Sequence, residues 1–199
     1  MPHAENSFPA SHPANSTTVP HQALPPGVAV LTFRKVKEPY GWLGNRAPYP
    51  VLAEGVSWRT NEALFQALRF ADPEIREAIR KAKSPMQAKF VARRSKDQPV
   101  VEPMGPPDCE YRRTWLPLQL ASDRFLRERL LPTGDALLYE DVSARVPPAQ
   151  GVAFVQGEGS LSATKRRSLF WGAVRVRDPF YGHNTLGRLW MELREACRG

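Results

Sequence analysis

Three helix-start signals follow one another between Trp58 and Arg94, and they constrain the fold more than any other part of the chain. Each signal is a Ser, Thr or Asp whose side chain can accept a hydrogen bond from the first helical turn: Thr60, Asp72 and Ser84. Asp72 and Ser84 are each followed directly by proline, which is favoured at the first helical position. The stretch therefore predicts three short, successive helices.

The first of these helices has two faces of different chemistry. Its apolar side repeats at helical spacing and predicts a buried stripe, made of Leu64, Ala67, Leu68 and Ala71. The opposite side repeats at the same spacing and consists of Glu62, Phe65, Gln66 and Arg69. A wholly solvated face seldom carries a phenylalanine in its middle. We expect this side either to be covered by another element or to line a ligand site.

Basic residues accumulate in the second half of the same stretch. Seven Lys and Arg residues and no Asp or Glu lie between Arg80 and Lys96. Such a run usually forms a solvated face. Because two helices are predicted to begin nearby, a phosphate site at Lys89, Arg93 and Arg94 is a rival interpretation.

The charge of the whole chain points the same way. All 28 Lys and Arg and 19 of the 20 Asp and Glu residues lie after residue 27, which gives that part a formal net charge of +9. This excess suits a phosphate-bearing partner, either a nucleotide or nucleic acid. It is also compatible with plain solubility combined with arginine-rich codon usage.

Composition excludes several classes of protein. No apolar run approaches the length of a membrane span, and the N-terminus lacks a secretory pattern, so we expect a cytoplasmic protein with no membrane partner. Cys109 and Cys197 are far apart and form no zinc motif, and only one of four histidines, His183, follows the first 21 residues. We expect neither a metal ion nor a cofactor. In an enzyme of this composition, carboxylates would carry the proton transfers.

The pattern of apolar segments predicts a single, helix-dominated α+β domain over residues 28–199, with four to six helices around short antiparallel strands. Residues 1–27 contain six prolines and predict a disordered tail. Strands are expected at 28–33, in a hairpin at 51–58, at 136–139 and at 169–176, and a helical pattern from 110 to 131 is interrupted by Pro117. Residues 144–168 predict an inserted, mobile loop or hairpin.

Two further segments supply candidate ligand contacts. The loop that contains Trp42, Asn45 and Tyr49 could stack on a planar ligand and hydrogen-bond it, although the two aromatics could equally cover the core. Asn184 is the expected N-cap of the last helix, and Gly187 leaves its first turn open to a ligand oxygen. The alternative for Asn184 and Gly187 is ordinary capping.

Four motifs stand in a fixed order along the chain: GWLGN…PYPV, W-R-T-N-E-x-x-F-Q-A-x-R-F, SPMQAK-x-x-x-R, and W-G…G-x-N-x-L-G-x-x-x-M-E-L-R. Over about residues 33–196 they resemble the NADAR/YbiA-like superfamily of N-glycosidases. The resemblance implies a YbiA-like fold and cleavage of a bond between ribose C1 and a nitrogen. It implies one of two substrates: a phosphorylated intermediate of riboflavin biosynthesis, or ADP-ribose attached to a guanine base in nucleic acid.

The resemblance also assigns site residues. It implies a catalytic carboxylate at Glu62 and ligand-site positions at Trp171, Gly172, Asn184 and Gly187. The sequence departs from the family pattern at Ala63, Cys109 and Ser168, where histidine, tryptophan and a carboxylate are usual. We expect Asp141 to supply the missing second carboxylate, with Glu158 as the alternative.

Three functions follow from these observations. The first is an N-glycosidase that removes ADP-ribose from a modified guanine, which the basic excess favours. The second is the same chemistry on a phosphorylated riboside of riboflavin biosynthesis. The third is a non-catalytic module that binds ADP-ribose or another nucleotide, which the three departures from the family pattern favour.

Overall fold

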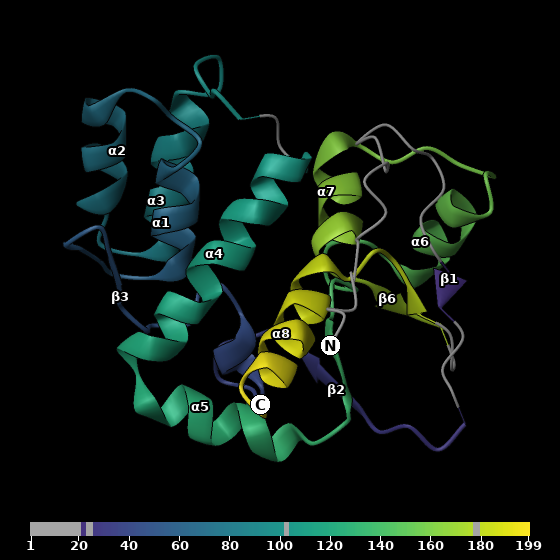
Figure 1. The fold of residues 1–199 in the computed structure, drawn as a ribbon. Coiled ribbons are helices and arrows are strands. Elements are labelled where there is room, and N and C mark those ends of the chain that lie inside the picture. The colour runs from purple at the N-terminus through teal and green to yellow at the C-terminus, as the bar shows by residue number, and fades with distance from the viewer. Residues whose placement is uncertain (1–20, 23–25, 102–103, 177–179) are drawn as a thin grey trace, which may run out of the picture.

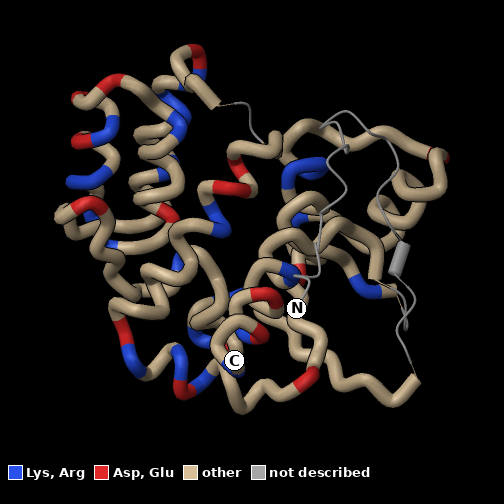
Figure 2. The backbone as a smooth tube through the Cα atoms, viewed as in Figure 1, with Lys and Arg blue, Asp and Glu red and all other residues tan. Residues whose placement is uncertain are grey.

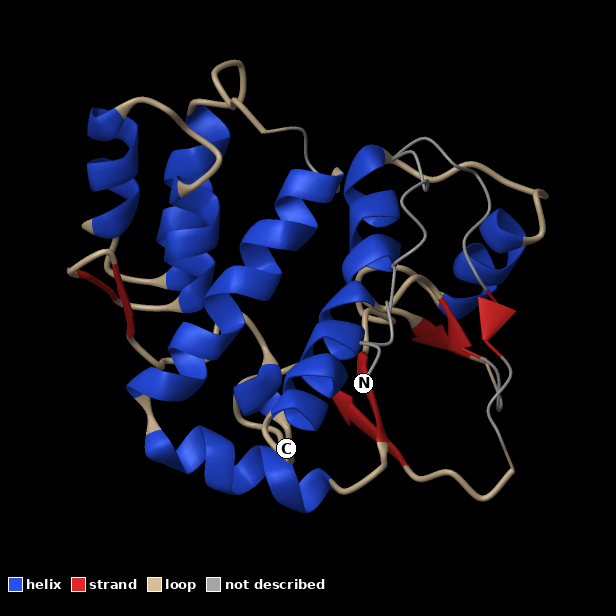
Figure 3. Ribbon diagram, in the orientation of Figure 1, coloured by secondary structure: helices blue, strands red, loops and turns tan. Residues whose placement is uncertain are grey.

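The computed structural model describes residues 21–22, 26–101, 104–176 and 180–199, in which helices predominate as expected (Figures 1 and 3). The helices α1 (Asn61–Ala67), α2 (Pro73–Arg80) and α3 (Pro85–Arg94) pack together on one side. The other side holds α6 (Pro148–Val155) and α7 (Ala163–Trp171). Between these groups lie α4 (Pro106–Ser122) and α8 (Thr185–Ala196), and α5 (Arg124–Leu130) follows α4.

The strands are short, and one pair is parallel. The expected hairpin is present as β3 (Val51–Ala53) and β4 (Val56–Trp58), and β6 (Val174–Arg175) pairs antiparallel with β7 (Phe180–Tyr181). In contrast, β2 (Val30–Phe33) runs parallel to β5 (Leu137–Glu140). Parallel pairing needs a long crossover, which the helices α1 to α5 provide. Two 3₁₀ turns cover Gly41–Leu43 (η1) and Leu131–Thr133 (η2).

The predicted helix starts are confirmed. Thr60 Oγ1 accepts a hydrogen bond from the Ala63 backbone N–H at 3.3 Å, and Asp72 Oδ1 accepts from that of Glu74 at 2.8 Å. Ser84 Oγ caps α3 by accepting from the Gln87 N–H at 3.1 Å. Each cap satisfies a backbone donor that the first turn leaves without a helical partner.

The expectation of a loop at 144–168 is wrong, because α6 and most of α7 lie there. Proline at the start of α6 and a Ser162 cap at the start of α7 are local helix signals that the surrounding Gly, Pro and Ser residues obscured. Phe154 and Leu169 are buried in one apolar cluster that holds the two helices against the chain. Since α7 continues to Trp171, the strand expected at 169–176 shortens to β6.

The expected interruption of the helical pattern at Pro117 is not found in the structure. The helix α4 continues through Pro117, and the chain turns only at Asp123, the N-cap of α5. The predicted tail lies mostly outside the described residues, namely at 1–20 and 23–25, while His21–Gln22 form β1 and pair with β7. None of the helices in the described ranges is long and apolar enough to cross a membrane.

The largest apolar cluster joins α4, α5 and α8 to the β2–β5 pair. Trp190 of α8 belongs to this cluster and is 1% exposed, and its Nε1–H donates to the Leu43 carbonyl oxygen at 2.8 Å. A second cluster ties α1, α2 and α3 to the β3–β4 hairpin. Phe65 points from α1 into the first cluster, so both faces of α1 are covered.

Candidate functional site

A cavity of about 260 Å³ lies where α1, α3, β5 and α7 meet. Eight predicted site residues line it: Asn45, Glu62, Phe65, Gln66, Arg69, Lys89, Arg93 and Trp171. They come from segments far apart in the sequence, and the structure brings them together around one space. The expectation that the polar and aromatic side of α1 is not solvated is therefore confirmed, because this side forms one wall of the cavity.

Glu62 is the buried acid of this wall, and only 6% of it is exposed. Its Oε1 accepts a hydrogen bond from Gln66 Nε2 at 2.8 Å and lies 3.9 Å from Lys89 Nζ. Burial alone would raise the pKa of Glu62, but the charges of Lys89 and Arg112 and the hydrogen bond from Gln66 outweigh it and lower the pKa. Glu62 is therefore an ionised carboxylate at neutral pH.

Arg112, from α4, is a site residue that the sequence reading missed. It is 1% exposed, its guanidinium lies 3.7 Å from the centre of the Phe65 ring, and Nη1 donates to Asn61 Oδ1 at 2.8 Å. Within the described part of the chain, Nε and Nη2 have no hydrogen-bond partner. Burial lowers the pKa of Arg112 to about 10, which leaves it cationic at neutral pH. A buried donor without a partner is costly, so a ligand acceptor in the cavity would be stabilised here.

A sequence signal for Arg112 exists in retrospect. It precedes Leu116 by four residues and Leu120 by eight, so it continues the buried stripe of α4. Burial of an arginine on an apolar stripe is costly unless its charge has partners, so Arg112 could have been singled out from the sequence.

Arg69 is fixed by an ion pair rather than free to move. Its Nε and Nη2 donate to the two carboxylate oxygens of Asp108 at 2.9 and 2.5 Å, and Asp108 is 0% exposed. Its Nη1 lies 3.4 Å from Gln66 Oε1. Arg69 thus lines the cavity as an oriented positive charge whose side chain is already ordered.

The second acid on the cavity wall is Glu140 and not the predicted Asp141. Successive residues at the end of a strand point to opposite sides, so only one of the two can face the cavity. Glu140 lines it and accepts from Arg145 Nη2 at 2.7 Å. Asp141 lies outside the lining: its Oδ1 accepts from the Ser143 N–H at 2.8 Å, and its Oδ2 is 3.5 Å from Arg34 Nη1.

The wall that α7 contributes is basic. Ser168 lines the cavity where the family resemblance implies an acid, and its Oγ donates to the Thr164 carbonyl oxygen at 3.1 Å. The neighbouring Arg167 also lines the cavity, and burial lowers its pKa. Glu158, the alternative second acid, is exposed and does not belong to the lining.

Three predicted contact residues lie elsewhere. Trp42 is buried in the core with its ring 6.0 Å from that of Trp190, and the Tyr49 hydroxyl accepts from Arg129 Nη1 at 3.0 Å. Arg94 is exposed, with its guanidinium 5.7 Å from the Phe90 ring. Of the proposed loop contacts, only Asn45 reaches the cavity, where its Oδ1 is buried and has no partner among the described residues.

Asn184 and Gly187 of the last motif do not line the cavity but contact β5, the strand that carries Glu140. Asn184 has a left-handed backbone (φ 50°), and its side chain makes no cap for α8. Instead, its Nδ2 donates to the Leu138 carbonyl oxygen at 2.8 Å and its Oδ1 accepts from the Glu140 N–H at 3.1 Å. At Gly187 and Gly172 a Cβ atom would collide with backbone oxygens of β5. These residues therefore hold the strand that carries Glu140, and the expected open helix turn at Gly187 is absent.

Positive charge dominates the cavity. Its two carboxylates, Glu62 and Glu140, face eight cations: Arg34, Arg46, Arg69, Lys89, Arg93, Arg112, Arg145 and Arg167. Figure 2 shows basic residues on α3, α4 and α7, the elements on either side of the cavity. The charge of Glu62 would raise the pKa of Lys89, but burial and the nearby Arg145, Arg93 and Arg46 lower it overall. The excess of cations over carboxylates in the lining favours a ligand with several negative charges.

Metal ligation and thiol chemistry concern other residues of the described chain. The described residues contain no group of three or more His, Cys, Asp or Glu that could hold a metal ion. Burial raises the pKa of the Cys109 thiol to about 11, so it is protonated and a poor nucleophile at neutral pH. The acidic side chains that line the cavity are Glu62 and Glu140.

Known proteins are similar to this chain over most of its length. No protein-family model matches it. It is 29% identical over 166 residues to N-glycosidase YbiA of Escherichia coli (strain K12), covering 83% of this chain and 87% of that protein. It is 32% identical over 171 residues to N-glycosidase Npun_R5314 of Nostoc punctiforme, covering 84% and 92%.

Two further comparisons extend the similarity. The riboflavin biosynthesis protein VVA0006 of Vibrio vulnificus is 24% identical over 169 residues, which are 84% of this chain and 38% of that protein. The NMR structure of the E. coli protein YbiA superposes with a TM-score of 0.65 at 28% identity, over 85% of each chain.

Proposed function

The chain belongs to the NADAR/YbiA-like family of N-glycosidases and is a hydrolase of N-glycosyl bonds, and we propose that it removes ADP-ribose from a guanine base in nucleic acid. The observation that carries this proposal is the surplus of cations around one buried, ionised carboxylate. An ADP-ribosyl substrate brings a diphosphate, and the attached nucleotide brings further phosphates. Arg93 and Lys89 of α3 and Arg145 and Arg167 opposite them are suited to such oxygens.

The reaction exchanges a C1–N bond for a C1–O bond. As the C1–N bond breaks, its electron pair stays on the base nitrogen and positive charge develops on the ribose. Glu62 stabilises that cation through its ionised carboxylate and accepts a proton from the attacking water. Water oxygen bonds to C1, and the protonated Glu62 then gives its proton to the base nitrogen. Glu62 is ionised again, and the products are free ADP-ribose and the unmodified base.

The leaving base meets Arg112, a buried residue of the cavity lining. The two unpartnered N–H groups of Arg112 can donate to guanine O6 or N7, both of which are acceptors. These bonds strengthen as negative charge builds on the base, and therefore favour the transition state over the bound substrate. The Trp171 ring, which also lines the cavity, offers an apolar surface to the base, whereas the guanidinium of Arg112 covers the Phe65 ring at 3.7 Å.

Glu140 supplies the second carboxylate that the family pattern has at the position of Ser168 and that this chain lacks there. It faces the cavity from the end of β5 and is oriented by Arg145. Its role is to bind and orient the attacking water opposite the departing base. Asp141 is tied to the Ser143 backbone and takes no part in this step.

The experiment uses an oligonucleotide that carries ADP-ribose on guanine and measures free ADP-ribose by chromatography. Wild-type protein is expected to release ADP-ribose, and Glu62→Gln is expected to release little. Asp141→Asn is the matched control, since it also converts a carboxylate to an amide but outside the cavity. Release by Glu62→Gln at the wild-type rate would overturn the role of Glu62.

A second candidate substrate is a phosphorylated intermediate of riboflavin biosynthesis. The cavity volume of about 260 Å³ favours it, because that is at or below the lower end for small-ligand sites. The similarity to the Vibrio vulnificus riboflavin biosynthesis protein also supports it. Release of the free base from such an intermediate, with no release of ADP-ribose from modified DNA, would select this substrate.

A further inference from the structure

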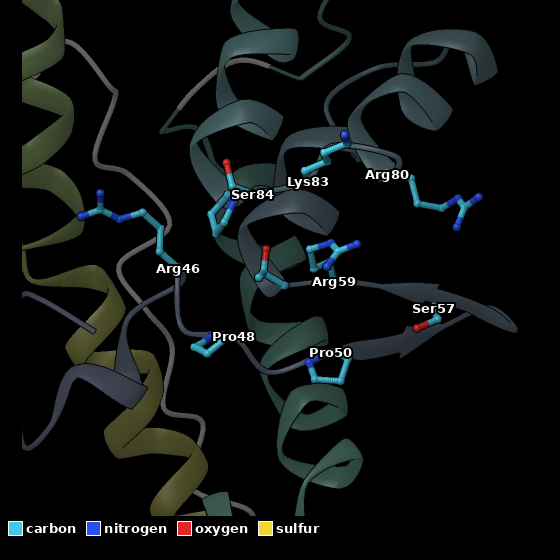
Figure 4. Close-up of a pocket in the computed structure, with 10 residues that line it drawn as sticks. Arg46, Pro48, Pro50, Ser57, Arg59, Arg80, Lys83 and Ser84 are labelled. Atoms are coloured by element: carbon cyan, nitrogen blue, oxygen red, sulfur yellow. The ribbon is translucent and has the colours of Figure 1, made fainter. Parts of the chain in front are cut away.

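A second hollow, of about 660 Å³, lies beside the cavity and has an almost wholly different lining. Figure 4 shows its cationic residues, which come from three segments: Arg46 after η1, Arg59 between β4 and α1, and Arg80 and Lys83 at the end of α2 and in the turn that follows it. Arg46 lines the cavity as well. The two spaces therefore meet at one side chain, and we refer to the second one as the basic groove.

The charge of the basic groove is available to a ligand. Arg59 and Lys83 are exposed and make no ion pair within the described ranges. Arg80 is partly neutralised by Glu77, whose Oε2 lies 2.6 Å from its Nε. No Asp or Glu belongs to the lining.

The start of α3 adds little to this charge. Ser84 Oγ already accepts from the Gln87 N–H, and Pro85 has no N–H to offer. Side-chain cations, rather than a helix terminus, are what the groove presents.

The shape and lining of the groove identify the part of a ligand that fits. It is more open to solvent than the cavity that holds Glu62. Its lining contains prolines, hydroxyl residues and cations but no aromatic ring. Without a ring to stack on, a base gains little here, whereas a sugar-phosphate backbone meets exposed Lys and Arg side chains.

We propose that the basic groove binds the phosphate backbone of the nucleic acid strand that carries the modified nucleotide. This inference rests on the proposed function, because it assigns the groove to the same substrate. Glu62 is 6% exposed at the wall of a small cavity, so the target nucleotide must leave a base stack to reach it. Phosphates beside that nucleotide then pass Arg46 and continue along Arg59 and Lys83.

The test measures binding of the full chain to unmodified, fluorescently labelled single-stranded DNA by anisotropy, over a series of salt concentrations. The variant Arg59→Ala/Lys83→Ala removes two groove cations and leaves the cavity intact. Each lost phosphate contact removes about 0.7 from the slope of log affinity against log salt, and the affinities converge near 1 M salt. The variant should therefore lose about 1.4 in slope and bind about 25-fold more weakly at 0.1 M salt.

The matched control is Lys96→Ala/Arg124→Ala, which removes two exposed cations, one just after α3 and one on α5. It should retain most of the wild-type affinity. Equal losses in both double variants, or wild-type binding by the groove variant, would overturn the proposal. So would wild-type protein that fails to bind DNA, or that binds labelled polyglutamate as tightly as DNA, because the partner would then be an acidic protein segment.

The outcome also separates the groove from the catalytic assignment. If the groove variant loses DNA affinity while wild-type protein releases no ADP-ribose, the groove stands and the ADP-ribose substrate falls. If wild-type protein releases ADP-ribose while the groove variant binds DNA normally, the substrate stands and the groove proposal falls. Unfolding midpoints of all variants check that each is folded, as expected for exposed side chains.

Discussion

Replacing Glu62 with glutamine tests the electrostatics of the cavity directly. The change keeps the size of the side chain, and the amide oxygen can still accept the hydrogen bond that Gln66 Nε2 makes at 2.8 Å. The negative charge is what disappears. Effects on stability and on turnover therefore report the charge rather than a packing defect.

The direction of the Glu62 pKa shift predicts whether Glu62→Gln is more or less stable than the wild-type protein. The Coulomb attraction to Lys89 across 3.9 Å is at most about 4 kcal/mol at an effective dielectric constant of about 20, and partial exposure of Lys89 reduces it. Relief of the burial cost of Glu62 opposes this loss. Because the pKa of Glu62 is lowered on folding, the combined effect of Lys89, Arg112, Arg69 and the hydrogen bond from Gln66 exceeds the burial cost. Glu62→Gln should therefore be the less stable protein at pH 7.

The lowered pKa of Glu62 also predicts how the difference in unfolding free energy between wild type and Glu62→Gln depends on pH. A lowered pKa contributes stability above the unfolded value, about 4.3, and that stability is lost as pH falls through the folded pKa. The gap in free energy of unfolding between wild type and Glu62→Gln should therefore be largest near pH 7 and shrink below about pH 4. Denaturant titrations at several pH values measure it.

Turnover should fall far more than stability. Loss of a positioned carboxylate in proton transfer and charge stabilisation typically costs a factor of about 10² to 10⁴, or about 2.7 to 5.4 kcal/mol in the barrier. The assay is release of ADP-ribose, or of free base from a riboflavin intermediate, under single-turnover conditions. The reasoning would be refuted by a gap in unfolding free energy that is constant from pH 7 to pH 3.5, or by a turnover rate within a factor of three of wild type.

Three further predictions follow from the contacts around the cavity. Asp108→Ala leaves the buried guanidinium of Arg69 without its carboxylate and should cost about 3 to 5 kcal/mol in unfolding free energy, measured by denaturant titration. Gly187→Ala places a Cβ against the backbone of β5 and should lower the free energy of unfolding by about 1 to 3 kcal/mol. The control Gly199→Ala, where no atom lies near the added Cβ, should cost nothing measurable. Glu140→Gln should lower kcat by about 10²-fold or more, while Asp141→Asn should leave kcat within about threefold of wild type; equal effects would contradict the assignment of the second carboxylate.

Local chemistry explains what the sequence predicted correctly. The caps at Thr60, Asp72 and Ser84 depend on residues three or fewer positions away, so their signals do not need the tertiary fold. The cavity-facing side of α1 was also predictable, because a phenylalanine within a polar stripe indicates a face that is either covered or lines a cavity.

Tertiary relations explain what the sequence left open. Alternation dictates that either Glu140 or Asp141 faces the cavity, but the side depends on the parallel pairing of β5 with β2, more than a hundred residues away. The position of Arg112 depends on how α4 packs across α1. The two helices within 144–168 were hidden because their glycines and prolines serve as helix ends and close contacts, as at Gly151, which packs against Val174.

The side chain of Asn184 has a consequence for how this molecule opens. By bonding to both Leu138 and Glu140, it gives β5 the two hydrogen bonds that a neighbouring strand would otherwise supply. The backbone amide proton of Glu140 is therefore shielded by the entrance to α8 rather than by a sheet. Its exchange with solvent deuterium requires α8 to come away from β5, so the end of β5 that carries the acid and the last helix should exchange as one cooperative unit.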